Sequence, residues 1–259
     1  MESGSAAKKR KTGRGWRTVG YVILLLVWVA ASTIASQLVV GYLMLFLLGY
    51  ESFTQPVWTA VYSALSYVVT MALIITVPLL IARKRHIDAT LSRKTLGLRD
   101  LPTWTDIGLA PAGFIVYVLV AFLVTSLFSF FPWFDANQAQ DVGFSVYISG
   151  TDRLIAFFTL VVVAPIAEEI IFRGWLYGKL RERLNQNISN IASMIVSTLI
   201  VSILFGVLHL QWNVGVNVFA MSLVLCGLRE ITGTIYAGIL MHMVKNGVAF
   251  YLLYILGIG

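Results

Sequence analysis

The sequence is poor in charged residues. Asp, Glu, Lys and Arg make up 12% of its 259 residues, against roughly 25% in a typical soluble domain. It also has a single cysteine, Cys226, so an intramolecular disulfide is excluded, and the apolar run around this thiol predicts that it is packed inside the protein. These shortages exclude an ordinary soluble enzyme, a disordered chain and a protein whose charged surface binds nucleic acid.

Hydrophobic residues take the place of the missing charge: they make up 58% of the chain, and the mean hydropathy is +0.84. The first long apolar run exceeds the roughly 20 residues needed to cross a bilayer, and further spans follow it, which favours a signal anchor over a cleaved signal peptide. We therefore predict an all-α, multi-pass transmembrane helix bundle of about seven to eight spans. The expected spans are 20–48, 57–82, 107–131, one beginning near Leu154, 188–210, 214–228 and 234–258.

The formal net charge of +7 is unevenly placed. Basic clusters precede the first span and fill the segment after the second, and such clusters mark the cytoplasmic side of a membrane. This pattern predicts a multi-pass protein of the cell membrane with a cytoplasmic N-terminus. A nuclear-localisation reading of the first cluster fits poorly with so many spans. The two clusters are Lys8, Lys9, Arg10, Lys11, Arg14, Arg17 and Arg83, Lys84, Arg85, Arg93, Lys94, Arg99.

Three regions follow from this pattern. Residues 1–19 are expected to be a basic, disordered cytoplasmic tail, 20–149 the N-terminal membrane helices, and 150–259 the catalytic membrane region. The segment 132–152 has no helix signal and is expected to lie outside the membrane. No repeat of 20–50 residues is present.

Charged residues at membrane depth are costly and mark functional sites, and nearly all of them lie in the second half of the chain. In the segment 164–173, Glu169 and Arg173 are spaced i,i+4 in the favourable order, so they can neutralise each other on one helix face. Glu168 is turned about 100° from that pair and lacks a local counter-ion, which makes it the candidate general base. The alternative is a helix end whose charges reach the cytoplasm.

Two further pairs have the same spacing. Phe205 and His209 are i,i+4 in one apolar helix, and His242 and Asn246 are i,i+4 in another. Alone, each is a weak signal, because a lone histidine in an apolar helix is more often a core residue than a catalyst. Together with Glu168 they form a specific pattern.

Helix geometry allows these groups to meet. If the helix with the two glutamates ends near Leu184, an antiparallel hairpin places Glu168 and His209 at similar depth, at roughly 1.5 Å per residue. His242 reaches the same layer only if the charged tip 179–187 projects beyond the membrane.

A carboxylate, two histidines and an amide in a dry cavity suit hydrolysis of an amide. Glu168 and His209 could activate a water, while His242 and Asn246 could hold the developing oxyanion. No GxSxG motif is present, which argues against an acyl-enzyme. The favoured mechanism requires no cofactor. Zinc is the variant, with Glu168, His209 and His242 as ligands, although the chain has no HExxH motif.

The three motifs resemble those of the CAAX protease and bacteriocin-processing family, CPBP or Abi, which includes the type II CAAX prenyl endopeptidases. The resemblance covers about residues 150–255 and rests on EExxxR at 168–173, FxxxH at 205–209 and HxxxN at 242–246, supported by APIAEEIIFRGWLYGKL at 164–180 and GLRD at 97–100. Three motifs in order on three apolar helices are highly specific.

This resemblance implies an intramembrane endopeptidase in which Glu168 and His209 act on water. His242 and Asn246 would complete the site, and Glu169, Arg173 and Phe205 would support it. The implied substrate is a membrane-associated peptide or a lipidated protein, prenylated or bacteriocin-like, and the implied surroundings are membrane lipid, with no nucleic acid.

A non-catalytic membrane protein is the alternative. It would be either a bacteriocin immunity protein or a proton-coupled transporter that uses Glu168 and the histidines as a relay. The absence of internal repeats with paired broken helices argues against the transporter. Lys245, turned about 100° from the His242/Asn246 face, is expected to reach lipid phosphate rather than a substrate carboxylate.

Overall fold

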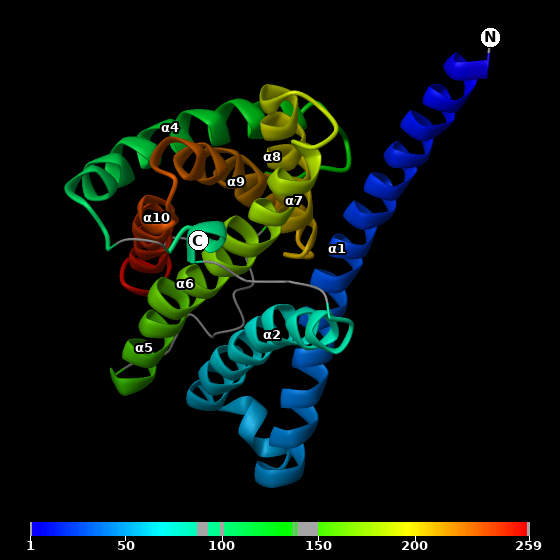
Figure 1. Cartoon of the computed structure of the whole chain (residues 1–259). Helices are drawn as coiled ribbons and strands as arrows, with labels where there is room; N and C mark the ends of the chain where they lie inside the picture. Colours follow the sequence, from blue (N-terminus) through cyan, green and yellow to red (C-terminus); the bar gives the residue numbers. More distant parts are fainter. Residues whose placement is uncertain (1, 87–92, 99–100, 137, 139–149, 258–259) are drawn as a thin grey trace.

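In the computed structural model, which describes residues 2–86, 93–98, 101–136, 138 and 150–257, all regular structure is helical (Figure 1). The all-α prediction is therefore confirmed over these residues. Six helices are long and apolar enough to cross a membrane: Gly15–Leu48, Pro56–Lys84, Trp104–Phe128, Gly150–Leu184, Asn190–Val207 and Trp212–Thr232.

The seventh expected span, 234–258, corresponds to α10, Tyr236–Tyr254, which is not among those six. The order of elements agrees with the predicted one throughout, and the count is close to it. The expected outer segment 132–152 falls largely outside the described residues; its described start contains turns, and the next helix begins at Gly150.

Helices α1 (Glu2–Leu48) and α2 (Pro56–Lys84) form an N-terminal pair joined by the short helix η1 (Tyr50–Thr54). In Figure 1 the N-terminal half of α1 extends away from the other helices, while α2 lies along its C-terminal half. The pair is tied by a 2.5 Å hydrogen bond between the hydroxyls of Ser36 and Thr70, both buried. The basic segment 2–19, expected to be disordered, is helical here as the start of α1; Lys and Arg are good helix formers, and an existing helix extends at little cost.

The fourth membrane helix, Gly150–Leu184, is continuous but contains two π-helical stretches. It consists of α5 (Gly150–Phe157), the π-helical η2 (Phe158–Val163), α6 (Ala164–Glu168), the π-helical η3 (Glu169–Leu176) and α7 (Tyr177–Leu184). Pro165 explains the first π-helical stretch, because it has no N–H to donate and its ring disrupts regular α-helical bonding. π-helical turns inside α-helices are common at functional sites, and here the second one begins at Glu169, directly after Glu168.

Helices α8 (Asn190–Val207) and α9 (Trp212–Thr232) pack closely, and α4 (Trp104–Phe128) lies across α9. A Cβ added at Gly206 would lie 2.7 Å from the carbonyl oxygen of Gly215, so only glycine allows this approach. The thiol of Cys226 is fully buried in the core, as predicted.

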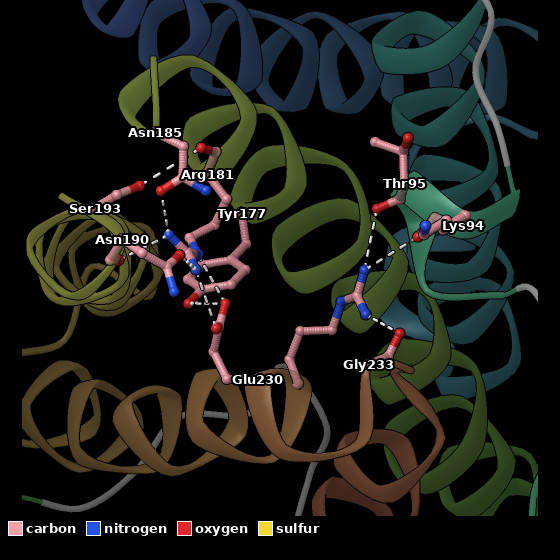
Figure 2. A network of polar contacts seen from close by, with 10 residues as sticks. Lys94, Thr95, Tyr177, Arg181, Asn185, Asn190, Ser193, Glu230 and Gly233 are labelled. Atoms are coloured by element: carbon pink, nitrogen blue, oxygen red, sulfur yellow. Dashed lines mark hydrogen bonds and ion pairs between the residues drawn. The ribbon is translucent and has the colours of Figure 1, made fainter. Parts of the chain in front are cut away.

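Polar contacts hold the charged ends of these helices together (Figure 2). From α7, Arg181 binds the carboxylate of Glu230 on α9 at 2.8 Å, and the hydroxyl of Tyr177 donates to the same carboxylate at 2.9 Å. Arg229 donates to the carbonyls of Thr95 (3.2 Å) and Gly233. The Arg229 contact with Thr95 connects the short helix α3, Arg93–Leu96, to α9.

Candidate active site

Glu168 lies at the last residue of α6, where the α-helix passes into the π-helical η3. Its side chain is 13% exposed, so it is largely withdrawn from solvent. The hydroxyl of Tyr67 on α2 donates a 2.5 Å hydrogen bond to its Oε1 atom. On the other side, Nε2 of His242 lies 3.7 Å from its Oε2 atom. The carboxylate is therefore held between α2 and α10.

Behind Glu168 lies a buried charged cluster. Glu169 and Arg173 are both 0% exposed and pair at 2.9 Å, which confirms the ion pair that their spacing predicted. The Nδ1 atom of His242 lies 3.1 Å from the same carboxylate oxygen of Glu169. Because a carboxylate only accepts, Nδ1 donates this bond, and Nε2 is the ring nitrogen that faces Glu168.

Phe205 is the aromatic centre of the site. Its ring centroid lies 4.9 Å from that of His209 and 6.2 Å from that of His242. The Arg173 guanidinium carbon lies 4.5 Å from the same centroid, in cation–π range. The fully buried Phe205 thus separates the two histidines and covers the charged cluster.

His209 lies in the turn 208–211 between α8 and α9, outside the six spanning helices. Its Nδ1 atom is 2.8 Å from the carbonyl oxygen of Phe205. Since a carbonyl only accepts, Nδ1 carries the proton and Nε2 is the free acceptor. Burial lowers the pKa of His209, and the nearby charge of Glu168 opposes this only in part. The ring is therefore neutral at pH 7 and suited to accept a proton.

Asn246 has a contact that the sequence did not predict: its amide nitrogen donates a 2.8 Å hydrogen bond to the carbonyl of Leu160 in η2. In π-helical bonding, the partner of Leu160 would be the N–H five residues later, at Pro165, which has none. The N–H of the preceding residue, Ala164, donates to the carbonyl oxygen of Thr159. Asn246 thus satisfies the carbonyl that the proline leaves unpaired, a requirement at membrane depth.

A cavity of about 230 Å³ adjoins Glu168 and His209. Glu168 comes from α6 and His209 from the turn after α8, so the fold brings these two predicted residues to one space. His242 contacts Glu168, but neither His242 nor Asn246 lines this cavity. The lining residues are Thr33, Gln37, Tyr62, Ser63, Ser66, Tyr67, Thr70, Glu168, Ile171, Phe172, Phe205, Leu208 and His209.

The fit of a metal ion depends on three ligands converging. Among the described residues, no group of three His, Cys, Asp or Glu side chains is arranged to hold one. His242 directs Nδ1 to Glu169 and Phe205 separates it from His209. The donor set Glu168, His209 and His242 therefore does not fit zinc in this arrangement.

Sequence reasoning missed one neighbour of the site, Tyr67. It lies in an apolar span, but Ser63, Ser66 and Thr70 share its helix face at i,i+3,i+4,i+7 spacing, and that polar stripe was a readable signal. Lys245, which was expected to reach lipid phosphate, interacts electrostatically with both Glu168 and His209.

Part of the chain is similar to a known protein family. Residues 150–248 match the family model of the type II CAAX prenyl endopeptidase Rce1-like proteins, a protease family. No curated protein and no solved structure matches the chain. The match contains all three motifs and the three cavity residues that the motifs supply, Glu168, Phe205 and His209. Residues 150–248 of this multi-pass membrane protein are therefore an Rce1-like domain, in agreement with the resemblance to the CPBP/Abi family.

Proposed function

We propose that the protein is an intramembrane endopeptidase in which Glu168 and His209 activate a water for attack on a peptide bond. The observation that carries this proposal is the shared cavity: two proton acceptors, 41 residues apart in the sequence, line one space of about 230 Å³. That volume suffices for a water and part of a peptide, since a water occupies roughly 30 Å³ in the liquid.

The contacts of Glu168 and His209 indicate a different role for each residue. Glu168 is the general base, because it is nearly buried and its oxygens face the hydroxyl of Tyr67 and Nε2 of His242. His209 orients the water through Nε2, its other nitrogen being held by the Phe205 carbonyl. After attack, the proton on Glu168 passes to the leaving amine, and the C–N bond breaks to give a carboxylic acid and an amine.

Glu169, Arg173 and His242 act as a rigid support for this base. The Glu169–Arg173 pair neutralises itself, so Arg173 does not serve as the counter-ion of the neighbouring Glu168. His242 links the two glutamates, because its ring contacts Glu169 at 3.1 Å and Glu168 at 3.7 Å. Asn246 supports the π-helical turn that precedes the glutamates.

The mechanism we propose needs no metal. With zinc bound, the ion itself would supply water activation, but Glu168, His209 and His242 would first have to converge. Cleavage that survives dialysis against a strong chelator supports the metal-free mechanism. Loss of cleavage after dialysis, followed by its recovery when zinc is added, would refute that mechanism.

The proposed substrate is a membrane-associated peptide or lipidated protein, prenylated or bacteriocin-like, cleaved by a cell-membrane enzyme with a cytoplasmic N-terminus. The cavity lies among helices long enough to span a bilayer, so a substrate must reach it from the membrane or its surface.

The experiment uses the full chain in lipid nanodiscs and a panel of quenched-fluorescence peptides, with and without a farnesylated cysteine. Glu168→Gln keeps the size of the side chain and removes the base, so we expect cleavage to fall at least about 10³-fold. Glu182→Gln is the matched control, because Glu182 is 60% exposed and pairs only with Lys179 at the surface. Equal cleavage by the wild type and Glu168→Gln would reject the mechanism, and proton uptake without cleavage would favour a transporter.

A further inference from the structure

The cavity beside Glu168 is built largely by helices outside the Rce1-like domain. Of its thirteen lining residues, seven belong to α1 and α2, and all seven carry a hydroxyl or an amide: Thr33, Gln37, Tyr62, Ser63, Ser66, Tyr67 and Thr70. Polar groups facing a space at membrane depth require partners. The N-terminal helices therefore contribute a polar wall to the site.

Ser66 is one of these groups. It is only 8% exposed, it lines the cavity, and its side chain interacts with that of Tyr62 on the same helix face. The wall is therefore lined by hydroxyl groups that a water or a peptide group could contact.

Tyr67 differs from the other six because it touches the proposed base. Tyr67 lines the cavity, and its hydroxyl donates to Glu168 Oε1 at 2.5 Å. Tyr62, more than one helical turn earlier on α2, lines the same cavity, but its hydroxyl is 3.4 Å from the carbonyl of Gln37 on α1. The hydroxyl of Tyr67 is thus bound directly to the base at the wall of the cavity.

The site also needs a donor for the oxyanion, and the two residues that the sequence suggested are engaged elsewhere. The amide of Asn246 is bound to the Leu160 carbonyl. The Nδ1 proton of His242 is bound to Glu169. Neither residue lines the cavity, whereas Tyr67 does.

We propose that Tyr67 is a catalytic residue of this protease, and that its hydroxyl moves its hydrogen bond from Glu168 to the substrate oxyanion during water attack. This inference rests on the proposed hydrolytic function. A hydrogen bond to a charged acceptor is roughly twice as strong as one to a neutral acceptor, so the hydroxyl follows the negative charge as it leaves Glu168.

The step balances without another reactant. The water oxygen bonds to the carbonyl carbon, the water proton passes to Glu168, and the carbonyl π electrons move to the substrate oxygen, which accepts the hydrogen bond from Tyr67. When the C–N bond breaks, the carbonyl re-forms, the amine takes the proton from Glu168, and the hydroxyl returns to the ionised carboxylate.

The test compares Tyr67→Phe with Tyr42→Phe in nanodiscs, using the panel peptide that the wild type cleaves fastest. Both changes remove one hydroxyl from the N-terminal helix pair, but Tyr42 on α1 is 70% exposed and does not line the cavity. We expect Tyr67→Phe to lower kcat about 10²- to 10³-fold, as loss of an oxyanion donor does, with KM changed less than about threefold because the interaction forms in the transition state. Tyr42→Phe should retain kcat within about threefold.

A second measurement separates oxyanion binding from mere positioning of Glu168. A phosphinic analogue of the same peptide carries a negative oxygen where the oxyanion forms. Tyr67→Phe should weaken binding of this analogue by the same factor by which it lowers kcat/KM. When Tyr67→Phe is added to the Glu168→Gln variant, the affinity for the intact peptide should not change. Unchanged affinity for the analogue, or near-normal kcat in Tyr67→Phe, would overturn the proposal.

The outcomes also distinguish a failure of the proposed function from a failure of the role of Tyr67. Normal cleavage by both Glu168→Gln and Tyr67→Phe would refute the proposed function itself, as would a wild type that cleaves no peptide, and the role of Tyr67 would fall with it. Loss of cleavage in Glu168→Gln alone would refute only the role of Tyr67. Gel filtration and thermal unfolding of each variant identify a folding defect, and the intact-peptide binding measurement then decides whether the site is preserved.

Discussion

The buried pair of Glu169 and Arg173 allows a sharp prediction about stability. Both side chains are 0% exposed, and they share one 2.9 Å contact. Glu169→Gln keeps the acceptor for His242 and the size of the side chain, but it leaves Arg173 charged without a counter-ion. Removing one partner of a buried pair costs about 3–5 kcal/mol, which corresponds to roughly a 10²- to 10³-fold or greater change in the unfolding equilibrium.

The double variant is expected to behave differently. Two nitrogens of Arg173, Nε and Nη2, and the Oε2 atom of Glu169 lack hydrogen-bond partners among the described residues, so the pair is incompletely satisfied. Replacing such a pair with apolar groups of similar size is often neutral or stabilising. Glu169→Gln combined with Arg173→Met should therefore recover at least about 2 kcal/mol of the loss, because Met packs well against an aromatic ring such as that of Phe205.

The assay is reversible unfolding in detergent micelles, monitored by tryptophan fluorescence for the wild type, both single variants and the double variant. Glu182→Gln is the control: its surface pair with Lys179 is 3.3 Å long and exposed, and such pairs contribute about 0–1 kcal/mol. If Glu169→Gln costs no more than Glu182→Gln, or the double variant is less stable than either single variant, the account of a charge-neutralised support behind Glu168 is wrong.

Three further predictions concern the turn after α8 and the contact of α3. Leu210 has a φ of 58° and is 89% exposed, so Leu210→Gly should relieve backbone strain and stabilise the protein by about 0.5–1 kcal/mol; destabilisation in the same unfolding assay would contradict this. Because burial lowers the pKa of His209, its ring should stay neutral as the pH falls below about 6.5, the ordinary histidine value. NMR titration of histidine-labelled protein checks this, with the His209 signal assigned from the His209→Gln variant. Its midpoint should lie below that of an exposed histidine. A midpoint at or above 6.5 would show that the charge of Glu168 dominates. A Cβ added at Gly178 would lie 2.7 Å from the carbonyl oxygen of Thr95, so Gly178→Ala should cost about 1–3 kcal/mol by displacing α3, whereas Gly227→Ala, which meets nothing within 4 Å, should not destabilise the protein.

The sequence alone determined the class of this protein and its helices. Apolar run length is set by bilayer thickness, and backbone groups in lipid must be satisfied within a helix, so span positions were readable without tertiary information. Helical spacing likewise predicted the Glu169–Arg173 pair. It also placed Phe205 beside His209, because i,i+4 neighbours meet in any helix.

Only the tertiary structure decided which groups share a space. The contact between Tyr67 and Glu168 joins residues 101 positions apart, and it depends on how α2 packs against α6, which no local pattern encodes. The same holds for Asn246, whose partner is a carbonyl left unpaired by Pro165 on another helix. Sequence identified the costly residues because charge is rare in an apolar chain; packing assigned their partners, because hydrogen bonds between helices depend on distances that spacing within one helix cannot fix.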